Sequence, residues 1–224
     1  MSEQSVLRSS AIMAAGTMIS RLTGLARNLL LVAALGTAII GDTYQVANTL
    51  PTIVYILVAG GALNAVFVPQ IVREMKSEDG GRSYASQLAT ATFTILGFAT
   101  VLGIVAAPLV VRLYAAKFGG AGLENEFELT VLFTRYCLPQ VLFLGLFTLF
   151  GQIANARGSF GPMMWAPILN NLVVIAVLIG FIAIAPDSAQ GVISANAKTL
   201  LGLGTSLGAL AQAAILIQIG RAHV

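Results

Sequence analysis

The sequence predicts an all-α, polytopic membrane protein in which six transmembrane helices form a bundle. Hydrophobic residues make up 57% of the chain and charged residues only 9%, whereas soluble domains carry about 25% charged residues. The mean hydropathy is +0.89. Six apolar runs reach or exceed the roughly 20 residues that cross about 30 Å of hydrocarbon: residues 6–35, 39–71, 83–115, 127–155, 159–185 and 198–218.

The first run, residues 6–35, is too long for a cleaved signal peptide and is interpreted as a spanning helix. It carries Arg21 and Arg27 near its middle, in the sequence S-R-L-T-G-L-A-R. An arginine near the bilayer centre costs roughly 3 kcal/mol, so both should face a polar cavity or an anion. On a straight helix they lie about 9 Å apart and about 240° around the axis. A bend at Gly24, between them, would turn both toward one cavity.

The second and third runs are separated by the longest polar stretch, residues 73–82. The second run, 39–71, opens with Asp42, which either stabilises the N-terminus of its helix or faces a cavity near the outer interface. Pro51 lies within this run, and a glycine pair follows it. The third run, 83–115, is expected to form one continuous helix.

The last three runs contain further helix breakers. Pro139 lies within 127–155, and two prolines lie early in 159–185. Broken helices are tolerated in membranes where the freed backbone groups are buried in protein or line a wet cavity, so the set favours a bent, cavity-forming bundle over plain close packing. Arg135 in the fourth run either extends to the outer interface or lines a cavity. The final run, 198–218, closes the bundle.

The distribution of basic residues predicts the orientation. If the spans alternate, one side of the membrane receives Arg8, Arg73, Lys76, Arg82 and Arg157. The other side receives Arg112, Lys117 and Lys198 together with Glu124, Glu126, Glu128 and Asp187. Because positive charge is retained on the cytoplasmic side, the first side is expected to be cytoplasmic. Both ends of the chain then lie inside.

The last seven residues, Q-I-G-R-A-H-V, correspond to CAG ATC GGA AGA GCA CAC GTC, the reading of a common sequencing adapter. We therefore expect residues 1–217 to be the native N-terminal lobe and residues 218–224 to be a non-native read-through tail. The alternative is a natural basic end after the sixth helix.

The sequence offers little support for enzyme chemistry. It contains no nucleotide-binding glycine-rich loop, metal-ligand cluster or catalytic triad, so we expect no cofactor, no metal site and no nucleic-acid partner. The single Cys137 cannot form a disulfide framework. Guanidinium groups, in contrast, are suited to gripping phosphate or carboxylate through paired hydrogen bonds. Membrane transport is therefore the function that the intramembrane arginines favour.

Several blocks of the sequence resemble the MurJ/MviN lipid II flippases. They are S-R-L-T-G-L-A-R-N from residue 20, G-D-T-Y-Q-V-A-N-T-L-P from residue 41, G-A-L-N-A-V-F-V-P from residue 61 and G-Q-I-A-N-A-R-G-S-F-G-P-M-M-W-A-P-I-L-N-N from residue 151. The likeness covers residues 7–217. It implies two six-helix lobes around a central cavity that moves by alternating access in the bacterial inner membrane. This chain would supply the first lobe, with the C-terminal lobe of the same protein missing.

The resemblance also implies a substrate and its site. Family members move an undecaprenyl-diphosphate-linked peptidoglycan precursor, and essential cations of their first helix match Arg21 and Arg27. Asp42 matches an acidic residue that opens the second helix. Further positions expected to line the cavity are Gly24, Asn28, Asn48, Tyr55 and Arg135. Two alternatives stay open: a polysaccharide-lipid or multidrug exporter of the same superfamily, and a membrane scaffold in which the two arginines are dispensable.

Overall fold

The computed structural model describes residues 3–36, 39–60, 68–74, 77, 79–120, 122–185, 188 and 193–222. All regular secondary structure in these ranges is helical, which confirms the predicted all-α class. In chain order the elements are α1 Glu3–Leu35, α2 Ile39–Tyr55, the π-helix η1 Ile56–Gly60, α3 Val68–Glu74, α4 Arg82–Val105, α5 Ala107–Tyr114, the 3-10 helix η3 Ala116–Gly119, α6 Glu124–Cys137, α7 Gln140–Ala156, α8 Gly161–Ile184 and α9 Ala195–Ala222.

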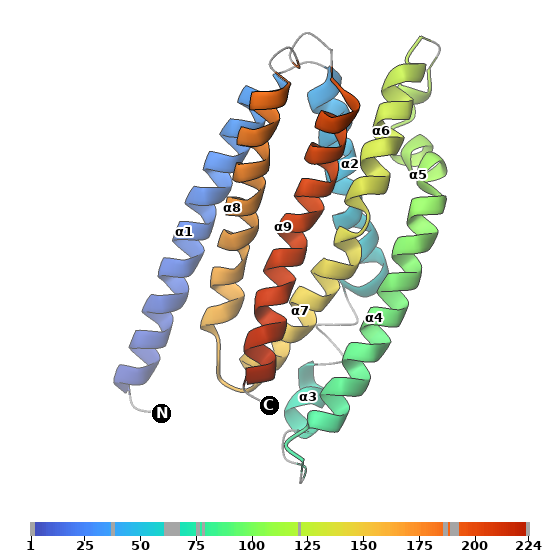
Figure 1. Cartoon of the computed structure of the whole chain (residues 1–224). Coiled ribbons are helices and arrows are strands. Elements are labelled where there is room, and N and C mark those ends of the chain that lie inside the picture. Colours follow the sequence, from blue (N-terminus) through green and yellow to red (C-terminus); the bar gives the residue numbers. More distant parts are fainter. Residues whose placement is uncertain are drawn as a thin grey trace.

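Consecutive predicted spans run in opposite directions through the bundle, whereas α1 and α8 run in the same direction (Figure 1). The first helix, α1, begins at the same end at which α9 finishes. In the described ranges, five segments are long and apolar enough to cross a membrane: Ser10–Leu35, Arg82–Val105, Glu124–Ala156, Gly161–Ile184 and Ala195–Ile219. The remaining predicted span, 39–71, contains the 17 residues of α2, the 5 of η1 and the start of α3. Two residues used in the predictions lie outside the described residues: Gly61 of the glycine pair and Lys76 of the polar stretch 73–82. The chain is therefore a multi-pass helical bundle, while the count of six spans stays a prediction.

The prolines divide two of the predicted spans. The run 83–115 is not one helix, because α4 ends at Val105 and α5 begins at Ala107 with Pro108 in its first turn. A proline lacks the backbone N–H and fits the first turn of a new helix better than the interior of an old one. At Pro139 the chain passes from α6 to α7, as the breaker predicted.

Glycines on α9 allow this helix to lie at the centre of the bundle, against α6, α7 and α8. A Cβ on Gly202 would come within 2.6 Å of the Tyr136 ring, and one on Gly204 within 2.6 Å of Val177. On Gly208 it would lie 2.4 Å from the Asn170 side-chain oxygen. Small residues at such contacts let membrane helices approach closely. Residues 218–224 were predicted to be a read-through tail. In the structure, α9 continues into this stretch and ends at Ala222.

The buried interior is mainly apolar, with a few polar contacts between helices. Tyr44 of α2 is buried edge-on against Phe133 of α6, with ring centroids 5.7 Å apart, and its hydroxyl pairs with that of Thr205 on α9. Large apolar side chains on α4 and α5 instead point outward; Leu113, for example, is 77% exposed. An apolar outer surface of this kind fits contact with lipid tails.

Candidate functional site

The two intramembrane arginines lie on α1, which runs as one helix from Glu3 to Leu35 through Gly24. The bend that we expected at Gly24 is therefore not present, and α1 is drawn as a single rod (Figure 1). Arg21 is exposed on the surface of the protein and Arg27 is half-buried. The Arg27 guanidinium donates to the Asn28 side-chain oxygen from Nε at 3.3 Å and from Nη2 at 3.1 Å. Within the described ranges, no carboxylate lies within ion-pair distance of either arginine.

The helical repeat shows where Arg21 points. Arg21, Asn28 and Leu35 follow one another at intervals of seven, so they drift only about 20° per step around the axis. Leu35 is 1% exposed and packs in a cluster with Ile40 and Tyr44 of α2. Arg21 and Asn28 therefore lie on the side of α1 that is directed toward α2.

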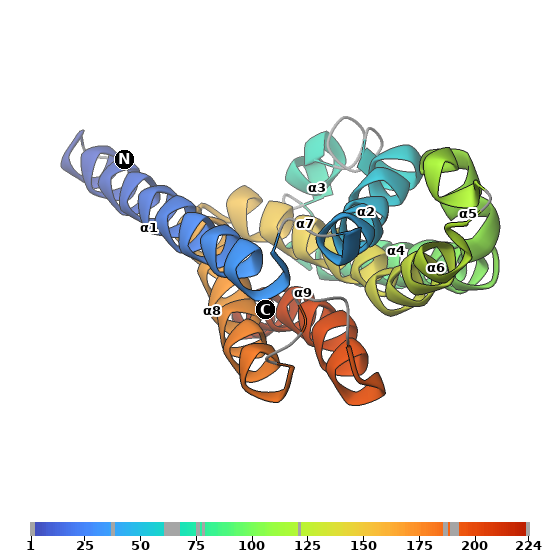
Figure 2. The same cartoon turned by 90° about the horizontal axis from the view of Figure 1, so that it is seen from above.

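The neighbouring side of α1, about 40–100° around the axis from Arg21, carries exposed apolar side chains: Met18, Leu22, Leu25 and Leu29. Arg21 thus borders the exposed apolar side of the helix, and α1 packs mainly on α8 and touches α2 little (Figure 2).

Arg27 lies about 120° around α1 from Arg21. It shares a face with Ser20 and Thr23, the two residues of α1 that contact Asn171 of α8. Arg27 therefore lies on the α8 side of α1, whereas Arg21 does not.

The segment that carries both arginines is held by a contact that the sequence analysis did not predict. Asn171 is 7% exposed, and its Nδ2 donates to the Ser20 carbonyl and to the Thr23 Oγ1, each at 3.0 Å. Gly24 lies at the same contact, where a Cβ would stand 3.5 Å from this nitrogen, at ordinary van der Waals distance. The signal was a buried amide within an apolar run; interhelical hydrogen bonds explain most such residues.

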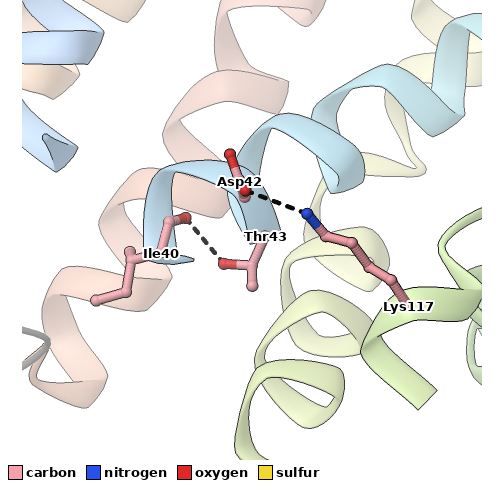
Figure 3. Close-up of polar contacts among 4 residues, drawn as sticks. All are labelled: Ile40, Asp42, Thr43 and Lys117. Atoms are coloured by element: carbon pink, nitrogen blue, oxygen red, sulfur yellow. Dashed lines mark hydrogen bonds and ion pairs between the residues drawn. The ribbon is translucent and has the colours of Figure 1, made fainter. Parts of the chain in front are cut away.

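Asp42 lies in the first turn of α2, where the helix dipole favours a carboxylate. Its Oδ2 pairs with Lys117 Nζ at 3.4 Å (Figure 3), and the side chains are 61% and 68% exposed. The neighbouring Thr43 hydroxyl donates to the Ile40 carbonyl at 2.8 Å. Arg27 is thus not the partner of Asp42 in this structure. An ion pair so open to solvent contributes about 0–1 kcal/mol.

Asn48 and Tyr55, which we expected to line the cavity, both bind α7. The Asn48 side-chain oxygen accepts from Gln140 Nε2 at 3.3 Å, and the Tyr55 hydroxyl donates to Thr148 Oγ1 at 3.0 Å. These two bonds fasten α2 to α7 above and below the Pro51 turn. Their side chains are therefore engaged within the lobe rather than free.

Arg135 on α6 lies apart from the arginines of α1. It is exposed and lines a cavity of about 870 Å³ near the end of the bundle at which α6 and α9 begin. Of the predicted site residues, the structure brings Arg27 and Asn28 into contact on α1, and it places Asp42 and Arg135 in other surroundings.

A comparison with known families decides what this bundle is. The family model described as lipid II flippase MurJ matches residues 31–223, which is most of the chain. The chain belongs to the lipid II flippase MurJ family. The match includes the MurJ segment around Asp42, Asn48, Tyr55 and Arg135, and begins after the two arginines of α1.

Curated MurJ relatives agree with this assignment. A lipid II flippase MurJ of Burkholderia cenocepacia is 35% identical over 73% of this chain and 32% of its own length. A probable lipid II flippase MurJ of Rhizobium tropici is 33% identical over 72% of the chain and 31% of its length, and one of Haemophilus influenzae is 26% identical over 88% and 38%. The chain thus spans about a third of the length of the MurJ relatives that it matches.

Proposed function

We propose that this chain is the N-terminal lobe of a flippase that moves lipid II, the undecaprenyl-diphosphate-linked precursor of peptidoglycan, across the bacterial inner membrane. Membership of the MurJ family supports this function, and the relatives' greater length supports a second lobe supplied by the remainder of the protein. Alternating access between two lobes would carry the polar head group past the hydrocarbon core. No catalytic step is required.

The observation that carries the proposal is the pair of guanidinium groups within the span of α1. Neither Arg21 nor Arg27 has an ion-pair partner in the part of the chain that the structure describes, and an uncompensated arginine at this depth is costly. A diphosphate supplies the missing negative charge. It also presents several oxygens to the planar donor fork of arginine, which binds phosphate with two parallel hydrogen bonds.

The two arginines would have different parts in holding the diphosphate. Arg27 already donates two of its five N–H groups to Asn28, so its guanidinium is oriented and keeps donors for a ligand. Arg21 has no such contact among the described residues and faces the α2 side of α1. We propose that Arg27 gives a fixed contact and that Arg21 closes on the ligand from the α2 side.

The ion pair of Asp42 would differ between the two conformations of the transporter. We propose that its ion pair with Lys117 is made in one conformation and exchanged in the other, as the second lobe moves relative to α2. With the N-terminus cytoplasmic, as the basic residues predict, this pair lies on the outer side of the membrane. Its exposure supports this role, because a pair worth about 0–1 kcal/mol is readily exchanged.

The test is complementation of a flippase-depleted strain with the full-length gene. Arg21→Ala and Arg27→Ala should each abolish growth, and Arg21→Lys should retain little, because lysine keeps the charge and loses the bidentate geometry. Arg73→Ala is the matched control, since Arg73 is exposed in the last turn of the short helix α3. Normal growth of both α1 alanine variants at wild-type protein levels would refute the proposed site.

The same experiment separates the alternatives. A scaffold without transport would tolerate the loss of both arginines. A multidrug exporter would need cavity acids to bind cations, whereas the intramembrane charges of α1 are both basic. The 224-residue chain alone should insert in membranes and fail to rescue growth, because one lobe cannot enclose a cavity. Rescue by this chain alone would overturn the half-transporter proposal.

A further inference from the structure

A second polar feature lies far from the arginines of α1, in the cavity of about 870 Å³ on α6. Two cationic side chains from different helices line it, Arg135 of α6 and Lys198 of α9, together with the acidic Glu126 and Glu128. Its volume falls within the range of about 300–1,000 Å³ that is usual for small-molecule sites. The mixture of charges is unusual for a surface that packs against lipid.

The charges of this cavity are not neutralised in pairs. In the described part of the chain, neither Arg135 nor Lys198 makes an ion pair or a side-chain hydrogen bond, and the one ion pair there joins Asp42 to Lys117 instead. Arg135 lies 11 residues after the start of α6, about 16 Å along the axis. At that depth a cation needs an anionic partner.

The order of the residues along α6 gives the cavity a polarity. Glu128 and Arg135 are seven residues apart, so they lie on one face, about 10 Å apart along the axis, with Glu128 nearer the end of the helix. Leu132 lies between them on the same face, and Ile40 and Ile193 add apolar wall. From the membrane surface inward, the face thus presents an acid, then an apolar residue, then a cation.

We propose that this cavity binds the head group of an aminophospholipid, a lipid that joins a phosphate to a primary ammonium. The phosphate lies inward against Arg135, and the ammonium lies outward against Glu128. A phospholipid in a bilayer has this same order, because its phosphate lies nearer the acyl chains than its ammonium does. The site is structurally separate from the proposed diphosphate site on α1 and does not depend on it.

The chemistry distinguishes this ligand from related ones. A primary ammonium donates hydrogen bonds to a carboxylate, whereas the quaternary ammonium of a choline lipid has no N–H to donate. A glycerol head group offers a phosphate without any cation for Glu128. Inorganic phosphate has neither the ammonium nor the apolar tails. The cavity should therefore prefer phosphatidylethanolamine to phosphatidylglycerol, phosphatidylcholine and free phosphate.

The experiment is native mass spectrometry of the 224-residue chain released from nanodiscs that contain equal amounts of the three phospholipids. The wild-type chain should retain phosphatidylethanolamine in preference to the other two. Arg135→Gln should lower its retention by about tenfold, as expected for the loss of one hydrogen bond to a charged group. Glu128→Gln should remove the preference over phosphatidylglycerol and leave phosphate binding in place. Added inorganic phosphate should not displace the lipid.

Two controls keep the test specific. Arg112→Gln removes a cation at the end of α5, where Arg112 lies 5.4 Å above the Phe127 ring and does not line the cavity. Glu124→Gln removes a charge at the start of α6, also outside the lining. Both variants should retain lipid as the wild type does. Equal retention of the three lipids by the wild type, unchanged retention in Arg135→Gln, or displacement by free phosphate would each overturn the proposal.

Discussion

Replacing Asn171 by leucine should loosen α1 from α8. The substitution keeps a side chain of similar size and removes both hydrogen bonds that cross the interface, to the Ser20 carbonyl and the Thr23 hydroxyl, each at 3.0 Å. Interhelical hydrogen bonds in membrane proteins average about 0.6 kcal/mol and reach about 1.7 kcal/mol. Removing two such bonds should lower the free energy of unfolding by about 1–3 kcal/mol.

The structure places the expected value in the lower part of that range. The Thr23 hydroxyl also bonds the carbonyls of Ile19 and Ser20 within α1, so neither acceptor loses all of its partners when Asn171 is replaced. A loss of about 1–2 kcal/mol corresponds to a fall in Tm of about 2–8 °C for a chain of this size. Because α1 packs mainly on α8, this loss falls on the helix that carries the two arginines.

Thermal unfolding in detergent measures the effect, and a double-mutant cycle assigns it. Thr23→Val removes the acceptor from the other side, so Asn171→Leu combined with Thr23→Val should cost less than the sum of the two single substitutions. Thr94→Val is the control, since the Thr94 hydroxyl is exposed on α4 and bonds only its own helix, at the Thr90 carbonyl. An unchanged Tm in Asn171→Leu, or full additivity in the double variant, would refute the proposed role of Asn171 in holding α1 against α8.

Three further outcomes are expected. Gly208→Ala should destabilise the bundle by on the order of 3 kcal/mol, because its Cβ would lie 2.4 Å from the Asn170 side-chain oxygen; a Tm equal to that of the wild type would contradict the close α8–α9 contact. Single cysteines at Ser77 and Asn125 should be labelled by an impermeant reagent from opposite sides of the membrane, with position 77 cytoplasmic; labelling of position 77 in intact cells would reverse the topology. The Ser77 hydroxyl and two backbone N–H groups at the start of α4 hydrogen-bond Asp79 and lower the pKa of its carboxyl. The ionised Asp79 carboxylate therefore stabilises the start of α4 above the ordinary carboxyl pKa, and this stabilisation is lost as the pH falls through the lowered pKa. Hydrogen exchange at the start of α4 should accordingly accelerate in acid in the wild type and not in Asp79→Asn.

Most of the fold could be predicted because lipid imposes a simple rule on the sequence. Apolar runs long enough to cross the bilayer must be helical. The runs that form α1, α8 and α9 each give one continuous helix. Pro139 also marked a real break. The break near Pro108 was visible in the sequence and was missed, because a proline near the end of a long apolar run does not show whether a new helix starts there.

The candidate site was harder to predict, because its contacts join residues far apart in sequence. The partner of Asp42 is Lys117, 75 residues away, and that of Thr23 is Asn171, 148 residues away. Charge and spacing showed that Arg21 and Arg27 need a partner, and could not say which helix faces them. The bend at Gly24 was expected because both arginines were predicted to face one cavity. The glycine instead lies within a straight helix, beside Asn171.

The pairing of α1 with α8 has a consequence for how the protein is made. The hydrogen bond from Asn171 to Ser20 joins residues separated by 151 positions. At a synthesis rate of about 5–20 residues per second, α1 enters the membrane roughly 8–30 s before its main packing partner exists. During that interval its two arginines lack α8, so the nascent helix must be sheltered by the insertion machinery or lie shallow in the bilayer. Within the described helices, α1 can thus reach its final place only after α8 has been made.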